Sequence, residues 1–180
     1  MRIISEESIL VVVDIQERLF SYMDKKAELT KKCLTLISGC KALNVPVVVT
    51  EQYTKGLGFT IDPINECLGE SKHIEKMTFS CCGESNFMLK IEEHYKENII
   101  LCGIESHVCV LQTAIDLVKT GHQPVVVADA VSSRNPYDKE IALRRMEKEG
   151  VIITSVEAIL FEMCRTSGTD SFKAISRLVK

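Results

Sequence analysis

The sequence predicts an α/β fold, a three-layer α/β/α domain built on a mainly parallel, Rossmann-like sheet of about six strands. Two observations lead to this prediction. Near-continuous runs of Val and Ile, bounded by polar residues, are typical of strands buried on both faces, and segments with helical spacing of apolar residues alternate with them. No repeat, low-complexity segment or linker interrupts the pattern, so we expect a single domain spanning residues 1–180.

The strands are predicted where β-branched residues dominate. "ILVVVDIQ" at 9–16 is the clearest case, because an apolar run ends abruptly in polar residues. "PVVVTEQ" at 46–52 repeats that pattern. The remaining predicted strands are 72–77, 98–104, 124–131 and 151–155.

The helices are predicted between the strands. Residues 24–44 place apolar side chains on one helical face and lysines on the other. Residues 107–121 form a helix that Gly121 ends. Further helices are expected over 84–97, over 138–150 and in the C-terminal part, whereas 53–69 reads as an irregular, glycine-bearing stretch. The apolar face of the first helix comprises Leu29, Cys33, Leu36, Ile37 and Cys40.

Composition excludes several classes of partner. The 22 basic and 25 acidic residues give a net charge of −3, which provides no basic surface for nucleic acid. No apolar run has the length of a membrane span, so we expect no membrane partner. The N-terminus is acidic before its apolar run and does not resemble a secretory signal. We therefore expect a cytoplasmic protein that acts on a small molecule.

Eight cysteines are many for a chain of 180 residues. In a cytosolic protein with a large core, free thiols are more common than a disulfide framework. The sequence contains no CxxC pair and no Cys/His spacing typical of a zinc site. For most of these cysteines the expected role is that of a small buried apolar residue.

Polar side chains follow the predicted strands where each strand ends. Ligands of open parallel sheets bind beyond the carboxyl ends of the strands, which predicts a catalytic site at this edge. The residues concerned are Asp14 and Gln16, then Glu51 and Gln52, Lys76, the segment "GIESHVC" (103–109), and Asp129 with "SSR" (132–134).

Cys109 is the candidate nucleophile, because it falls in the first turn of a helix just after a central strand. Free backbone N–H groups and the helix dipole favour an anion there, so the thiol is expected to ionise more easily than a free cysteine. The same N–H groups can stabilise an oxyanion. The alternative is a buried core cysteine like its seven companions.

Two charged residues are candidates to work with Cys109. Asp14 ends an apolar strand and could act as a general base, or could instead cap a helix or accept from a loop amide. Lys76 could pair with Asp14, although a solvated surface lysine is the more common case. His107 lies two residues before Cys109, and residues two apart on a helix do not face each other, so it is expected to line a pocket or begin the helix. Asp129 is expected to hold the loop after the fifth strand by hydrogen bonds.

Five motifs stand in order along the chain: "VVVDIQ", "VPVVVTEQ", "EKMTFSCC", "GIESHVCV" and "VVVADAVSSR". They resemble those of the isochorismatase-like cysteine hydrolases, a family that includes nicotinamidases and N-carbamoylsarcosine amidases. The resemblance covers nearly the whole chain.

The resemblance implies a catalytic triad of Asp14, Lys76 and Cys109. It also implies a cis peptide bond between Ile104 and Glu105, and an oxyanion hole formed by the backbone N–H groups of Glu105 and Cys109. Homo-oligomers are common in the family, so a homo-oligomer is expected. The residues expected to line the substrate pocket are Gln16, Glu51, Gln52, Phe79, Ile104, Glu105 and His107.

Departures from the family pattern narrow the expected activity. Nicotinamidases bind a metal through an Asp-x-His pattern after the second strand, where this chain has "TEQYTKG" without histidine. We therefore expect no metal, no other cofactor and no nicotinamidase activity. The segment resembles the subgroup of isochorismatase domain-containing proteins. Cys82 stands where the family often has an aromatic residue.

The sequence thus predicts a metal-independent hydrolase of a small-molecule amide or related C–N bond, acting through a thioester on Cys109. Two alternatives remain open. One is a fold kept as an interaction module without turnover, and the other is a thiol redox sensor centred on Cys109.

Overall fold

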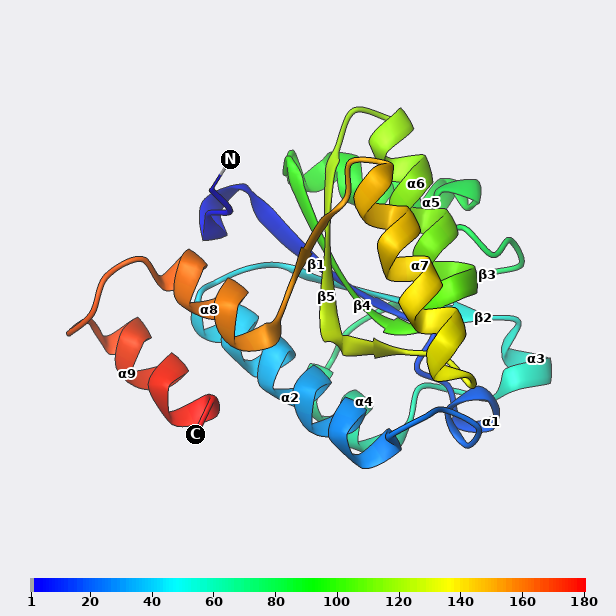
Figure 1. Ribbon diagram of the computed structural model, residues 1–180, viewed down its shortest axis with the longest axis horizontal. Helices are drawn as coiled ribbons and strands as arrows, with labels where there is room; N and C mark the ends of the chain where they lie inside the picture. The colour runs from blue at the N-terminus through cyan, green and yellow to red at the C-terminus, as the bar shows by residue number, and fades with distance from the viewer. Residues whose placement is uncertain (1) are drawn as a thin grey trace.

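The computed structural model describes residues 2–180 and contains a six-stranded sheet in which every neighbouring pair is parallel (Figure 1). The order β3-β2-β1-β4-β5-β6 is that of a Rossmann-like sheet, with β1 and β4 at its centre. The predicted fold class is confirmed. The strands are β1 (Ser8–Val13), β2 (Val47–Gln52), β3 (His73–Lys76), β4 (Asn98–Ile104), β5 (Gln123–Ser132) and β6 (Ile152–Thr154).

Helices cover both faces of the sheet (Figure 1). The helices of one face are α2 (Lys26–Ala42), α4 (Asp62–Leu68), α8 (Val156–Cys164) and α9 (Asp170–Leu178). Those of the other face are α5 (Ser85–His94), α6 (Leu111–Lys119) and α7 (Pro136–Lys148). The short helices α1 (Glu17–Phe20) and α3 (Thr54–Leu57) and the 3-10 turns Ser5–Glu7 and Cys81–Gly83 complete the chain, with the π-helical turn Ser106–Val110 before α6.

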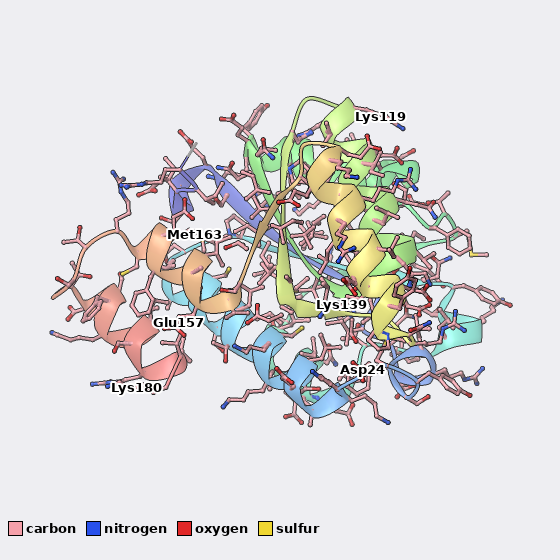
Figure 2. All side chains as sticks on the ribbon, in the orientation of Figure 1. Asp24, Lys119, Lys139, Glu157, Met163 and Lys180 are labelled. Carbon is pink, nitrogen blue, oxygen red and sulfur yellow. The ribbon has the colours of Figure 1, made fainter. Side chains whose placement is uncertain are left out.

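Strand β1 shows why the apolar runs are continuous. Leu10 and Val12 pack on the side of α2, whereas Val11 and Val13 pack on the side of α6, because successive side chains point to opposite faces. All six residues of β1 are buried. Side chains fill both layers between the sheet and its helices (Figure 2).

Several predicted boundaries are corrected by the backbone. The first strand ends at Val13 and not at residue 16, because Asp14 adopts a left-handed conformation with φ 50°. The helix predicted over 84–97 ends at His94, because Tyr95 has φ 50°. The stretch 53–69, expected to be irregular, contains α3 and α4.

The predicted apolar face of α2 is confirmed, since Leu29, Cys33, Leu36, Ile37 and Cys40 are all buried. All eight cysteines are free thiols. Within residues 2–180, no helix is long and apolar enough to cross a membrane.

Gly103 allows β4 to lie against the end of β1. It is paired in register with Val13 and has φ +121°, and an added Cβ would collide with the carbonyl oxygen of Val13. We expect Gly103→Ala to lower the free energy of unfolding by about 3–5 kcal/mol, because backbone strain and the clash act together.

Gly69→Ala is the matched control for that variant. Gly69 also has a positive φ, but no atom lies within 4 Å of the added Cβ. Its expected cost is about 1–2 kcal/mol, from the backbone conformation alone. Urea unfolding of both variants measures the difference, and equal losses would show that the contact with Val13 is unimportant.

Candidate active site

Four neighbouring strands bring the predicted site residues together. The parallel strands β3, β2, β1 and β4 end at the same edge of the sheet, and Asp14, Gln52, Lys76 and Glu105 lie at or just after their carboxyl ends. The sheet order therefore places these four residues along one edge of the sheet.

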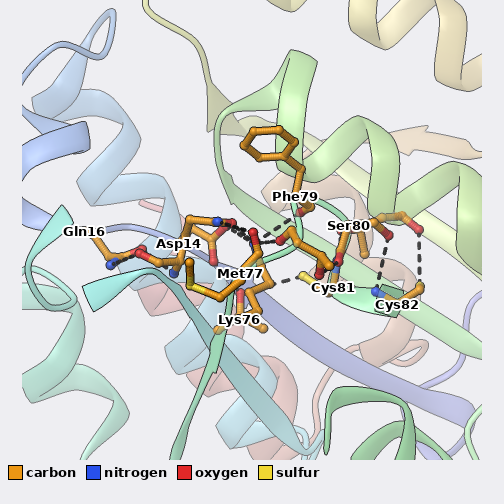
Figure 3. Close-up of polar contacts among 12 residues, drawn as sticks. Asp14, Gln16, Lys76, Met77, Phe79, Ser80, Cys81 and Cys82 are labelled. Carbon is orange, nitrogen blue, oxygen red and sulfur yellow. Dashed lines mark hydrogen bonds and ion pairs between the residues drawn. The ribbon is translucent and has the colours of Figure 1, made fainter. Parts of the chain in front are cut away.

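Lys76 lies inside the protein and not on its surface, with 1% of its surface exposed. Its Nζ donates to Asp14 Oδ2 at 2.6 Å and to Gln52 Oε1 at 2.8 Å (Figure 3). The carbonyl oxygens of Thr78 and Phe79 accept from the same Nζ at 3.2 Å each. Four oxygen acceptors thus replace the water that a surface lysine would bind.

The surroundings keep Lys76 charged. Burial alone would lower its pKa, but the charge of the Asp14 carboxylate outweighs that effect and raises it, as does any negative charge on Cys81 and Cys109. The ammonium group is therefore a fixed positive charge beside the candidate nucleophile.

Asp14 is completely buried and accepts hydrogen bonds from side chains on two strands. Oδ2 accepts from Lys76, and Oδ1 accepts from the hydroxyl of Thr50 at 2.7 Å. The charge of this carboxylate is thus paired and hydrogen-bonded, as burial requires. These contacts place Asp14 in the polar site and not at a helix cap.

Cys109 lies in the π-helical turn before α6 and is 5% exposed. Burial raises its pKa, and the charge and hydrogen-bond acceptance of Asp14 raise it further, while Lys76 acts in the opposite direction. The expectation that the helix start lowers the pKa of Cys109 is therefore wrong for the free protein. The resting group is a thiol beside the carboxylate that can take its proton.

Gln16 and Gln52 connect the loops around this site. Gln16 Nε2 donates to the carbonyl oxygens of Gln52 and Gly58, and its Oε1 accepts from the N–H of Gln52. Gln52 Nε2 donates to the carbonyl of Met77 while its Oε1 holds Lys76. Gln16 is thus fully engaged with main-chain groups.

Glu51 is not brought to the polar site. Successive residues of a strand face opposite sides, and its neighbour Gln52 is the one that reaches Lys76. Glu51 Oε1 accepts from the N–H and hydroxyl of Thr60 at 2.7 Å each and lies 2.9 Å from His73 Nδ1. Burial would raise the pKa of Glu51, but these hydrogen bonds outweigh it and lower it.

The segment after β4 has the expected cis peptide bond between Ile104 and Glu105. Glu105 is 5% exposed, and its Oε1 accepts from Arg134 Nε at 3.0 Å. His107 Nδ1 lies 2.9 Å from the hydroxyl of Ser133, the residue just after β5, so the histidine contacts that loop and not Cys109.

Two further predicted residues differ in exposure. Ile104 is buried completely, whereas Phe79 is 55% exposed near the site (Figure 3).

Asp129 accepts from the N–H of Val156 at 2.8 Å and pairs with Lys32 at 2.9 Å. It therefore fixes the start of α8 and not the loop after β5.

Sequence reasoning missed the residues that act through tertiary contacts. Thr50 holds Asp14, and Thr113 accepts the N–H of Cys81 at 2.9 Å. Ser106, in the turn that carries Cys109, is buried with no hydrogen-bond partner for its hydroxyl among the described residues. Thr50 could have been found only from its place two residues before Gln52, because alternate residues of a strand point to the same face.

In the part of the chain that the structure describes, no group of three His, Cys, Asp or Glu side chains could hold a metal ion.

Two relatives of this chain, similar to it in sequence, carry the isochorismatase name. The sequence model described as Isochorismatase domain matches residues 8–158. The chain is 39% identical to the secreted isochorismatase effector Isc1 of Phytophthora sojae, over 99% of this chain and 87% of that protein. It is 33% identical to isochorismatase domain-containing protein 2 of Danio rerio, over 99% of this chain and 89% of that protein.

Solved structures show the same fold. The MAR1 ribonuclease from Caenorhabditis elegans superposes with a TM-score of 0.94 at 37% identity, over 99% of this chain and 92% of that one. The YcaC gene product from Escherichia coli, titled an octameric hydrolase of unknown specificity, superposes with a TM-score of 0.93 at 20% identity, over 99% and 89%. The chain belongs to the isochorismatase family.

Proposed function

We propose that this protein is a hydrolase of a small-molecule amide or related C–N bond, in which Cys109 is the nucleophile. The observation that carries the proposal is the buried ion pair of Lys76 and Asp14 at 2.6 Å, which lies beside the Cys109 thiol. An ion pair removed from water is costly to maintain, and packing alone does not call for a lysine and an aspartate there. A nucleophile with an adjacent base is the arrangement that acyl transfer needs.

The first half of the reaction forms a thioester. The sulfur of Cys109 attacks the substrate carbonyl carbon while Asp14 takes the thiol proton. The backbone N–H groups of Glu105 and Cys109 donate to the oxyanion of the tetrahedral intermediate. As the intermediate collapses, Asp14 returns the proton to the nitrogen, the C–N bond breaks and the amine leaves.

Hydrolysis of the thioester restores the enzyme. Asp14 takes a proton from water, the resulting hydroxide attacks the thioester carbonyl, and the C–S bond breaks. The proton passes back to the sulfur of Cys109. Lys76 keeps a positive charge next to both ionisable partners throughout, which lowers the cost of the negative charge that moves between Asp14 and the sulfur.

The pocket that receives the substrate is proposed from the residues around the thiol. Glu105 and His107 belong to the segment that precedes Cys109, and Phe79 is the exposed aromatic side chain nearby, whereas the completely buried Ile104 packs in the core on the opposite face of the sheet. Gln16 and Gln52 act indirectly, by holding the loops and Lys76. The position of Glu51, bound to Thr60 and His73, gives it a role in the loop and not in the pocket.

We also propose one domain that works as a cytoplasmic homo-oligomer, without metal or other cofactor and without a nucleic-acid or membrane partner. The YcaC protein of Escherichia coli, described as an octameric hydrolase, supports assembly, and eight free thiols fit a reducing compartment. The Phytophthora sojae relative is titled as secreted, so cell fractionation is the test of location.

The activity is tested with a panel of small primary and secondary amides, N-carbamoyl compounds, esters and a short RNA, because one relative is titled a ribonuclease. We expect release of ammonia or an amine from at least one amide, with metal chelator present. Cleavage of RNA with no amide hydrolysed would overturn the proposal.

Thiol ionisation tests the role of Asp14. Asp14→Asn removes the carboxylate whose charge and hydrogen-bond acceptance raise the pKa of Cys109, and it leaves Lys76 in place. We expect the pKa of Cys109 to fall in this variant. Ultraviolet absorbance of the thiolate against pH, with Cys109→Ser subtracted in each background, measures the change.

In the unmodified protein, Cys109 should show no thiolate at pH of about 8.5, where a free cysteine is half ionised. The Asp14→Asn protein should titrate lower but should not turn over substrate, because the proton acceptor is absent. Identical titrations in the two proteins would show that Asp14 does not act on the thiol.

A further inference from the structure

A second thiol, that of Cys81, is buried beside Cys109. Both belong to the apolar cluster between the sheet and helices α5, α6 and α7. The N–H of Cys81 donates to the hydroxyl of Thr113 at 2.9 Å, and Thr113 lies four residues after Cys109, one helical turn away. The loop after β3 therefore brings Cys81 to the helix that carries the nucleophile.

The two thiols also share one electrostatic environment. Asp14 and Lys76 act on the pKa of Cys81 as they do on that of Cys109. Negative charge on Cys81 also raises the pKa of Cys109, so ionisation of one thiol opposes that of the other. The Asp14–Lys76 ion pair therefore acts on the ionisation of both thiols.

A hydrogen-bond chain connects Cys81 to the base. Cys81 Sγ donates to the hydroxyl of Thr50 at 3.8 Å, and that hydroxyl donates to Asp14 Oδ1 at 2.7 Å (Figure 3 shows Cys81 and Asp14). Every donor in this chain points toward the carboxylate, so a proton can leave Cys81 for Asp14 through Thr50. Burial raises the pKa of Cys81 to about 12, so its thiol needs such a base before it can act as a nucleophile.

The other nearby cysteines lack this connection. Cys82 is adjacent in sequence, but its Sγ donates to the carbonyl of Thr113 at 3.9 Å. Cys33 and Cys102 lie in the cluster on the opposite face of the sheet, where Cys33 Sγ donates to the carbonyl of Ala130. The route to Asp14 thus distinguishes Cys81 from these three cysteines.

We propose that Cys81 is a resolving thiol, which forms a reversible disulfide with Cys109 after a hydroperoxide oxidises Cys109. In the first step the Cys109 sulfur attacks the peroxide, the O–O bond breaks, and sulfenic acid and an alcohol form, with the thiol proton passing to the alcohol oxygen. In the second step Cys81 attacks the Cys109 sulfur and the S–O bond breaks.

In the second step the hydrogen-bond chain carries the proton that Cys81 loses. The Cys81 proton passes through Thr50 to Asp14 and then to the departing hydroxide, which leaves as water. Overall, two thiols and one hydroperoxide give one disulfide, one alcohol and one water. An external dithiol restores both cysteines by exchange.

This inference goes beyond amide hydrolysis and does not depend on it. A disulfide at Cys109 removes the nucleophile reversibly, and it protects the sulfenic acid from further, irreversible oxidation to the sulfinic acid. The site is therefore expected to be switched off by peroxide and switched on again by dithiol.

The test oxidises the full-length protein and its Cys81→Ser, Cys81→Ala and Cys82→Ala variants with hydrogen peroxide, blocks free thiols, and maps peptides without reduction. The unmodified protein and Cys82→Ala should yield the cross-linked Cys81–Cys109 peptide, which dithiothreitol removes. Both Cys81 variants should lack it and should accumulate sulfinic acid on Cys109. Cys81→Ser keeps the side chain's size, so folding does not decide the result.

Thr50→Val tests the proton route separately. It keeps the shape of Thr50 and removes the hydroxyl, so the sulfenic acid should persist and react with dimedone at least about tenfold more than in the unmodified protein, because loss of general-base assistance costs about 10²–10⁴ in rate. A disulfide between Cys109 and Cys82, no oxidation at Cys109, or sulfinic acid forming equally fast with and without Cys81 would overturn the proposal.

Discussion

Cys109→Ser should abolish hydrolysis of any amide that the protein turns over, with a fall in kcat of at least about 10³-fold, because removal of a catalytic nucleophile costs at least this much in comparable enzymes. The hydroxyl is smaller than the thiol and far less acidic, so the proton transfer to Asp14 becomes much harder. The fold should be retained, because the change is small and Cys109 lies at the edge of its cluster with 5% of its surface exposed.

Steady-state kinetics and thermal unfolding of the same preparation measure both quantities. Cys164→Ser is the control, because this partly buried cysteine lies in α8 on the opposite face of the sheet and should leave turnover unchanged. Turnover that survives in Cys109→Ser would exclude the thioester mechanism.

Lys76→Met should cause the largest loss of stability among single changes at this site. It removes the only side-chain cation within hydrogen-bonding distance of Asp14 in the described chain and leaves a completely buried carboxylate, which should cost about 3–5 kcal/mol in the free energy of unfolding. Methionine fills a similar volume, so packing contributes little to this loss.

The double variant Asp14→Asn/Lys76→Met separates the ion pair from the individual residues. With both charges removed, no unpaired charge stays buried, so the loss should be smaller than the sum of the two single losses by about 1–3 kcal/mol. Urea unfolding of the four proteins gives this coupling. Lys90→Met is the surface control, since Lys90 pairs with Glu93 on the exposed side of α5 and should change stability little.

Additive losses at Asp14 and Lys76 would contradict the interpretation of a coupled buried pair. If the Lys76→Met protein were as stable as the Lys90→Met protein, Lys76 would be solvated and not buried. Activity should be lost in both single variants, whatever the outcome for stability.

The sequence allowed the sheet and its catalytic edge to be predicted for a simple reason. Buried parallel strands read as continuous apolar runs, so the polar residue that ends each run marks the carboxyl end of the strand. This reasoning makes Asp14 and Lys76 candidates, whereas their grouping with Cys109 comes from the resemblance to the isochorismatase-like cysteine hydrolases. The structure pairs Lys76 with Asp14 at 2.6 Å.

The same continuity explains why Glu51 was misplaced and Thr50 was missed. A strand buried on both faces has no alternation of polar and apolar residues, so "VVVTEQ" does not tell which of its three polar residues face the site. The structure places Thr50 and Gln52 toward Asp14 and Lys76, and Glu51 toward Thr60.

The acidity of Cys109 was also beyond prediction from sequence. A helix start favours a thiolate, but burial and a nearby carboxylate oppose it, and neither their depth nor their distance can be read from residue order. In the structure these two effects dominate and raise the pKa of Cys109. Cys81 is buried in a core cluster, as the sequence predicts for most of the cysteines, but its contact with Thr50 joins segments 31 residues apart and cannot be read from residue order.

The most direct test of the central claim is the intact mass of the protein quenched with acid during turnover of an amide found in the panel, followed by peptide mapping. The thioester mechanism predicts a mass increase equal to the acyl group, located on Cys109 and removed by neutral hydroxylamine. An acyl group mapped to another residue, or hydrolysis that continues at full rate in Cys109→Ser, would contradict it.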